Sequence, residues 1–208
     1  MRNPFRWPAM LVIGVVMAFG AQVQAQSNPP GPPASAEDIS RRVLKLIESL
    51  KTNQDITPAV VEKFTGVRLI SPVESISEWT DSDGKKHSQR SSDPDGAAAT
   101  GKLAPPWLYH LQIYRYPPEK TRARFDLSFV PGTTADLDTA DMTPVCAFDF
   151  DAHAAAFKDM GFKESIIYGP HGSRRGEMFS RGAINVHLYP GGRPNAAGRS
   201  CVWMINVE

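Results

Sequence analysis

Cysteine is scarce in this chain of 208 residues, which contains only Cys146 and Cys201. Neither has a C-x-x-C partner, and none of the five histidines stands in an H-x-x-x-H spacing, so the close ligand pairs of common zinc sites are missing. The segment FDFDAH offers Asp149, Asp151 and His153 as cation ligands. It lacks the glycine and the distal glutamate of a calcium loop, and helix capping accounts for Asp151 without a metal ion. We therefore predict no metal site.

The chain also lacks the motifs of nucleophilic and nucleotide chemistry. The G-x-S-x-G elbow is absent, and Ser173 stands two residues from His171, a spacing at which loop side chains seldom point together. The segments GPHGSRRG (169–176) and PGGRPNAAGR (190–199) have neither Walker nor dinucleotide spacing. Both lie between predicted strands instead of opening onto a helix, so we interpret them as turns and expect no cofactor.

The N-terminus has the pattern of a secretory signal peptide. Arg2 and Arg6 precede the apolar run 9–21, and the small-residue pattern Val23-Gln24-Ala25 follows. The run is shorter than the ~20 residues of a membrane-spanning helix, which disfavours the alternative of a retained anchor. We expect residues 1–25 to be cleaved after Ala25, which would leave a periplasmic or secreted protein without a stable membrane anchor.

Excess charge of one sign is also missing. Removal of residues 1–25 deletes two arginines and no acidic residue, which leaves 21 basic against 22 acidic residues and a formal net charge of −1. Without a basic excess, and with an export signal, nucleic acid is not an expected partner.

The two cysteines are expected to form one disulfide. Exported proteins meet an oxidising compartment, where a pair of thiols that can approach each other is oxidised. Two buried free thiols remain the alternative.

The remaining chain predicts one α+β domain over residues 35–208, preceded by a flexible leader rich in proline and glycine at 26–34. Ser35 is positioned to cap a first helix, and Thr57 with Pro58 begins a second helix that Gly66 ends. Residues 81–106 are polar, small and bounded by prolines, and we predict a disordered loop there.

The second half of the chain reads as strands with one helix among them. Apolar alternation over 107–116 and 122–130 predicts a hairpin, and further strands are expected around 165–168, 177–189 and 201–207. Asp151 is the expected cap of a helix over 152–160. The predicted fold is therefore an N-terminal helical hairpin followed by a mainly antiparallel sheet with one inserted helix and one disulfide.

Charge is distributed unevenly along this second half. Residues 132–164 contain seven acidic side chains and two lysines, whereas residues 168–208 contain five arginines and two glutamates. Arginine suits bidentate contacts to carboxylates and phosphates, so we name Arg174, Arg175, His171 and Arg193 as candidate binding residues. The alternative is a solvated surface whose charges are paired internally with the acidic segment 132–164.

Two functions are compatible with these observations. The first is an exported binding or inhibitor-type protein whose arginine-bearing turns contact another exported or envelope protein, or an acidic envelope ligand. The second is a small cell-envelope hydrolase with a dispersed site of His153, His171, His187 and nearby carboxylates. A pocket that joins a histidine to a carboxylate would favour the hydrolase, whereas a convex rim of arginines would favour binding.

Overall fold

The computed structural model describes residues 30–80, 82–93, 95–116, 122–132, 137, 139–195 and 197–208. The predicted signal peptide lies outside these residues. Within them, no helix is both long enough and apolar enough to span a membrane.

Two helices open the domain, as predicted, and local signals fix their ends. The hydroxyl of Ser35 accepts the Asp38 amide at the start of α1 (Ala36–Ser49). The hydroxyl of Thr57 does the same for the Val60 amide at the start of α2 (Pro58–Thr65), after a short 3-10 turn η1 (Asn53–Asp55). Gly66 ends α2 in the left-handed conformation, with φ of 72°.

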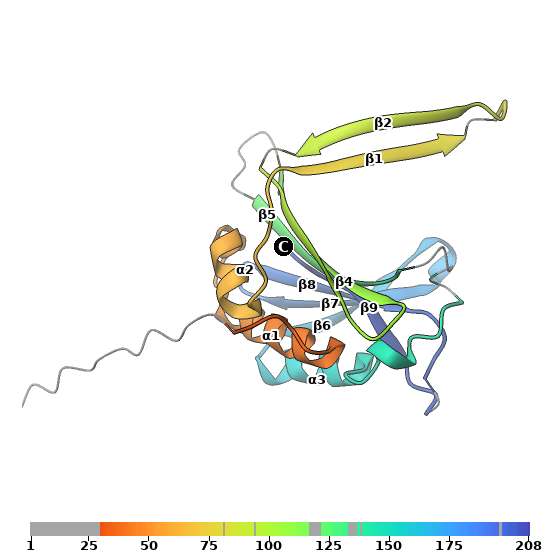
Figure 1. Ribbon diagram of the computed structural model, residues 1–208. Coiled ribbons are helices and arrows are strands. Elements are labelled where there is room, and N and C mark those ends of the chain that lie inside the picture. The colour runs from red at the N-terminus through yellow and green to blue at the C-terminus, as the bar shows by residue number, and fades with distance from the viewer. Residues whose placement is uncertain are drawn as a thin grey trace, which may run out of the picture.

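The rest of the chain forms two antiparallel sheets and a third helix. A separate hairpin of β1 (Val73–Thr80) and β2 (Lys86–Asp93) projects away from the main sheet (Figure 1). The seven-stranded sheet has the order β3-β4-β5-β9-β8-β7-β6. Its strands are β3 (Ala97–Lys102), β4 (Trp107–Tyr116), β5 (Arg122–Pro131), β6 (Lys163–Tyr168), β7 (Arg174–Arg181), β8 (Ile184–Gly191) and β9 (Cys201–Val207). The predicted α+β class, with α3 (Phe150–Asp159) inserted between β5 and β6, is confirmed.

The register places one row of apolar side chains across the middle of the sheet. Leu127 of β5 pairs with Ile205 of β9, which pairs with Leu188 of β8, and all three are fully buried. The helices lie against this apolar face (Figure 1). Because side chains alternate along a strand, the residues directly before and after each of these three point to the opposite face of the sheet, which we call the open face.

Residues 81–106 require a correction, because this range contains β2 and β3 where composition predicts a loop. β2 (KHSQRSSD) has no apolar alternation and is held by its pairing with β1. In β3, Gly101 leaves room for the Tyr109 ring, since a Cβ on Gly101 would lie 2.1 Å from that ring. The amino-acid composition of 81–106 indicates neither the pairing of β2 with β1 nor the contact between Gly101 and Tyr109.

Two further boundaries differ from the sequence prediction. The expected single strand over 177–189 is a hairpin of β7 and β8 that turns at Gly182, with φ of 60°. The cap of α3 is Asp149, whose side chain accepts the Ala152 amide at 2.9 Å, and not Asp151. The predicted bond between Cys146 and Cys201 is present and joins the end of the 3-10 turn η2 (Thr143–Val145) to the first residue of β9.

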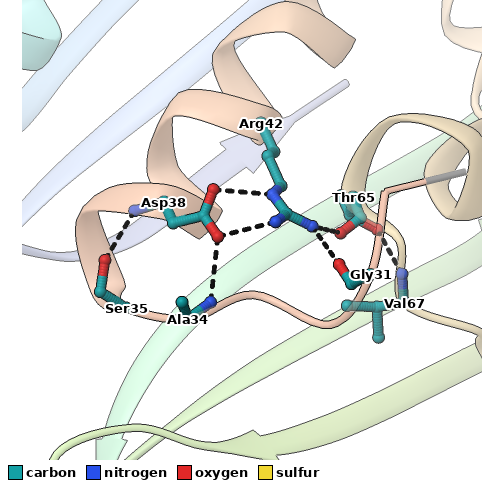
Figure 2. A network of polar contacts seen from close by, with 7 residues as sticks. All are labelled: Gly31, Ala34, Ser35, Asp38, Arg42, Thr65 and Val67. Carbon is teal, nitrogen blue, oxygen red and sulfur yellow. Dashed lines mark hydrogen bonds and ion pairs between the residues drawn. The ribbon is translucent and has the colours of Figure 1, made fainter.

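The described part of the leader contacts both N-terminal helices (Figure 2). Arg42 forms two hydrogen bonds with the Asp38 carboxylate and also donates to the carbonyl oxygens of Gly31 and Thr65. Partial burial works against ionisation of Asp38, but hydrogen bonds from Arg42 and the Ala34 amide outweigh it and lower the pKa of this carboxyl. Arg42 therefore connects residues 30–34 to α1 and to the end of α2.

Candidate functional site: an arginine-lined end of the sheet

The two arginine-bearing turns lie at the same end of the main sheet. The β6–β7 turn (169–173) precedes Arg174, and the β8–β9 connection (192–200) carries Arg193 and Arg199. Because β7 and β8 are antiparallel, the start of β7 and the end of β8 are neighbours. The sheet order thus brings together two segments that are apart in sequence.

A cavity of about 270 Å³ opens at this end, and Arg174 and Arg199 both line it. The N-terminus of α3 forms another wall through Phe150 and Asp151. The remaining lining residues are Pro190, Gly198 and Ser200.

Each of the two arginines is oriented by a buried carboxylate. Arg174 pairs with Glu177, and Nη1 of Arg199 lies 2.6 Å from Oδ2 of Asp149. The arginine side chains are 56% exposed, whereas the Glu177 and Asp149 side chains are 4% and 3% exposed. The negative charges therefore lie inside the protein and the positive charges face solvent at the cavity.

Local structure explains how Arg199 reaches this position. The side chain of Asn195 accepts the amides of Ala197 and Arg199, both at 3.0 Å, and so shapes the β8–β9 connection. The Phe150 amide then donates to the Ser200 carbonyl oxygen at 3.0 Å and joins that connection to α3. The disulfide joins Cys201, the first residue of β9, to Cys146 at the end of η2, four residues before α3 begins.

The predicted binding residues separate into different surroundings, and only Arg174 lines the cavity. Arg175 is exposed and its side chain crosses Gly169, where an added Cβ would lie 2.4 Å from Nε of Arg175. His171 is exposed in the turn, in a left-handed conformation with φ of 65°. Arg193 is exposed where its backbone bridges to Asp141.

Arg181, the remaining arginine of the same basic segment, has internal contacts. Its guanidinium donates to the Ile47, Glu48 and Leu50 carbonyl oxygens at the end of α1, at 3.0 to 3.2 Å. It donates as well to the Met160 carbonyl oxygen at the end of α3. Arg181 is thus satisfied inside the protein, but by backbone carbonyl oxygens and not by acidic side chains of residues 132–164.

The three histidines of the hydrolase hypothesis do not converge. His153 is completely buried on α3, and His171 lies in the exposed β6–β7 turn. His187 stands between the core residues Val186 and Leu188 and so points to the open face, where Nε2 lies 3.5 Å from Oε1 of Glu208.

His153 is neutral at ordinary pH. Nδ1 lies 2.8 Å from the Asp149 carbonyl oxygen, which can only accept, so Nδ1 carries the proton. Nε2 has no partner within the described residues. Burial lowers the pKa of His153 to about 4.

Sequence reasoning missed a polar network on the open face. Arg124 holds the Asp126 carboxylate through two hydrogen bonds of 3.0 and 2.9 Å, and the Asn206 amide donates to the same carboxylate. Nearby, burial raises the pKa of the Tyr189 hydroxyl, which lies 3.3 Å from Nδ1 of His187. In the sequence, Asp126 and Asn206 stand at polar positions of alternating strands, but only the pairing of β5 with β9 shows that they are neighbours. The charges of Arg124 and Asp126 satisfy each other, so this network stabilises the sheet.

Two further cavities accompany the arginine-lined one. A cavity of about 450 Å³ contains His110, whose ring nitrogens lie 2.9 and 3.0 Å from Thr100 and Gln112. Another, of about 350 Å³, lies beside Trp107 and Asp141. None of the three joins a histidine to a carboxylate, and no group of three or more metal-ligating side chains occurs within the described ranges.

Comparison with known proteins leaves the site without a relative. No family model matches the chain, and no match was found among curated proteins or among solved structures.

Proposed function

We propose that this chain is an exported binding or inhibitor-type protein that holds a carboxylate of an acidic partner between Arg174 and Arg199. One observation carries the proposal: two half-exposed arginines converge on one cavity, while the carboxylates that orient them are buried. A guanidinium has five N–H donors, so an arginine that is paired on one side retains donors for a second carboxylate.

The buried carboxylates favour binding because they position the arginines in advance. A free arginine side chain loses conformational entropy when a ligand orders it, and an oriented one loses less. Asp151 lines the same cavity and repels additional negative charge. A single carboxylate therefore suits the site better than a phosphate dianion, and a partner protein rich in Asp and Glu is the class we propose.

The proposal is tested by affinity capture from a periplasmic extract with the wild-type protein and with Arg174→Lys/Arg199→Lys. Lysine keeps a cation beside each buried carboxylate but removes the planar pair of donors, so folding is maintained. We expect a stoichiometric partner whose affinity falls at least about tenfold in the double variant, a difference of about 1.4 kcal/mol.

Arg122→Lys is the matched control, because Arg122 is exposed at the first residue of β5 and does not line the cavity. Equal affinity of the wild-type and double-variant proteins for the captured partner would contradict the role of the cavity.

A further inference from the structure

The two edges of the main sheet differ in how the chain covers them. At the β3 edge, Ile70 and Ala98 exchange backbone hydrogen bonds of 2.8 and 2.9 Å, so the chain's own segment occupies part of that edge. Among the residues described, β6 pairs with β7 and with no other strand. No backbone hydrogen bond connects the outer side of β6 to another segment in the part of the chain that the structure describes.

The β6 edge also carries exposed apolar side chains. Ile166 is 44% exposed and Tyr168 is 64% exposed, and both belong to this strand of six residues. Ile70, near the opposite edge, is also exposed. An extended strand with unpaired backbone groups and apolar side chains is a template for strand addition.

The charges beside β6 favour an acidic segment. Glu164 is neutralised by Lys158, whose Nζ lies 2.7 Å from Oε2. The Arg175 side chain lies over Gly169, the residue that directly follows β6. Neither Lys163 nor Arg175 forms an ion pair with an acidic side chain among the residues described.

A second copy of the chain fits this edge poorly. Antiparallel pairing of two β6 strands would place Lys163 of one copy beside the Arg175 end of the other, and like charges opposite each other destabilise a strand pair. An acidic segment would meet a cation at each end instead.

We infer that β6 is a strand-addition site for an extended acidic segment of a partner protein. The segment pairs antiparallel with β6, lays apolar side chains on Ile166 and Tyr168, and places a carboxylate on Arg175. The inference rests on the proposed function for the acidic character of the partner, but it uses residues outside the arginine-lined cavity.

The probe is the fluorescein-labelled peptide Glu-Glu-Thr-Val-Thr-Val-Thr, titrated by fluorescence anisotropy into protein purified after expression of the full chain. Antiparallel addition places its glutamates at the Arg175 end. Two further peptides carry N-methyl groups, one on both valines and the other on the threonines that follow them. Because a strand donates to its neighbour through alternate residues, one methylated peptide is expected to lose binding and the other to retain it.

Protein variants then locate the peptide. We expect Ile166→Thr and Arg175→Gln each to weaken peptide binding about tenfold, while Arg174→Lys/Arg199→Lys leaves it unchanged. Both Ile166 and Arg175 are exposed, so the variants are expected to fold, and unchanged thermal unfolding midpoints will show that they do. Amide resonances of residues 163–168 are expected to shift in NMR spectra.

Equal binding of all three peptides would overturn strand addition. Peptide binding lost only in the cavity variant would overturn the β6 site while supporting the proposed function. Light scattering that shows a dimer dissociated by Ile166→Thr would overturn the assignment to an acidic segment, since a second copy would then occupy the edge.

Discussion

At the scale of single residues, His153 links the stability of the core to pH. Its pKa in the folded protein is about 4, below the ordinary value of 6.5, because burial disfavours the charged ring. As the pH falls, His153 is therefore protonated near pH 6.5 in the unfolded chain but only near pH 4 in the folded protein. The contribution of His153 to the free energy of unfolding is complete above pH 6.5, and it falls by about 3 kcal/mol as the pH decreases from 6.5 to 4.

The first prediction concerns this proton. His153→Asn keeps a donor for the Asp149 carbonyl oxygen but cannot titrate, so its free energy of unfolding should decline less between pH 6.5 and pH 4 than that of the wild type. Urea unfolding across this pH range measures the difference. His171→Asn, at an exposed histidine, is the matched control, and a slope for His153→Asn identical to that of the wild type would refute the prediction.

Arg41 and Arg42 allow a comparison between two arginines of one helix. Both pair with a carboxylate four residues earlier, but only Arg42 also donates to the Gly31 and Thr65 carbonyl oxygens (Figure 2). Arg42→Gln is expected to lower the free energy of unfolding by about 2 kcal/mol, and Arg41→Gln by less than about 0.5 kcal/mol, since exposed ion pairs contribute little. Equal costs in urea unfolding would show that the leader contacts add no stability.

At the scale of elements, Arg181 serves two helices at once. Its positive charge meets the carbonyl oxygens at the C-terminal ends of α1 and α3, where the helix dipole favours a cation. Arg181→Gln should therefore lower the free energy of unfolding by about 2 kcal/mol, which chemical denaturation measures. Arg175→Gln, at an exposed arginine of the same strand, should change it by less than about 0.5 kcal/mol, and a similar cost for both would contradict this role.

The disulfide lies next in sequence to two walls of the arginine-lined cavity, since Cys201 follows Ser200 and Cys146 precedes Phe150 by four residues. Its cysteines are 55 residues apart, a loop for which the chain-entropy estimate gives about 4 kcal/mol. Cys146→Ala/Cys201→Ala should lose roughly this stability and should also bind the captured partner more weakly, because Arg199 lies two residues before Cys201. Urea unfolding and the capture assay measure the two effects, and a reducing agent should not affect the double variant. Unchanged partner affinity would show that the bond does not position Arg199.

Sequence reasoning succeeded where an element depends on its own residues. Ser35, Thr57 and Gly66 fix the ends of α1 and α2 through local hydrogen bonds and backbone conformation, and these ends were predicted. The disulfide followed from a count of two cysteines in a chain with a predicted export signal. β2 was missed because its pairing with β1, and not an apolar pattern, holds it.

The site was predictable in part for the same reason. The arginine bias identified Arg174, but the cavity requires Arg199 and the buried Asp149, which the order of strands brings together. Arg174 and Arg175 are adjacent in sequence and were treated as one pair. Their side chains instead contact Glu177 and cross Gly169, respectively, and no local pattern distinguishes these surroundings.

At the scale of the whole molecule, export is the prediction with the simplest measurement. The sequence predicts cleavage after Ala25, so the exported protein should have the intact mass of a chain that begins at Gln26 with its disulfide formed. Mass spectrometry of periplasmic protein, with and without reduction, measures both features. A mass that includes residues 1–25 would contradict cleavage, and the cytoplasmic fraction serves as the control.

The central position of β9 sets an order of assembly. β9 lies between β5 and β8, yet it follows every other strand of the sheet in the chain (Figure 1). During synthesis from the N-terminus, β3, β4 and β5 can form one half-sheet, and β6, β7 and β8 can later form another. The edges of the two half-sheets that face each other, β5 and β8, both pair with β9. Gly198–Ser200, which wall the arginine-lined cavity, arrive immediately before it. The cavity can therefore form only once residues 198–200 have joined the walls that α3 and β7 supply, so it is among the last features of this sheet to assemble.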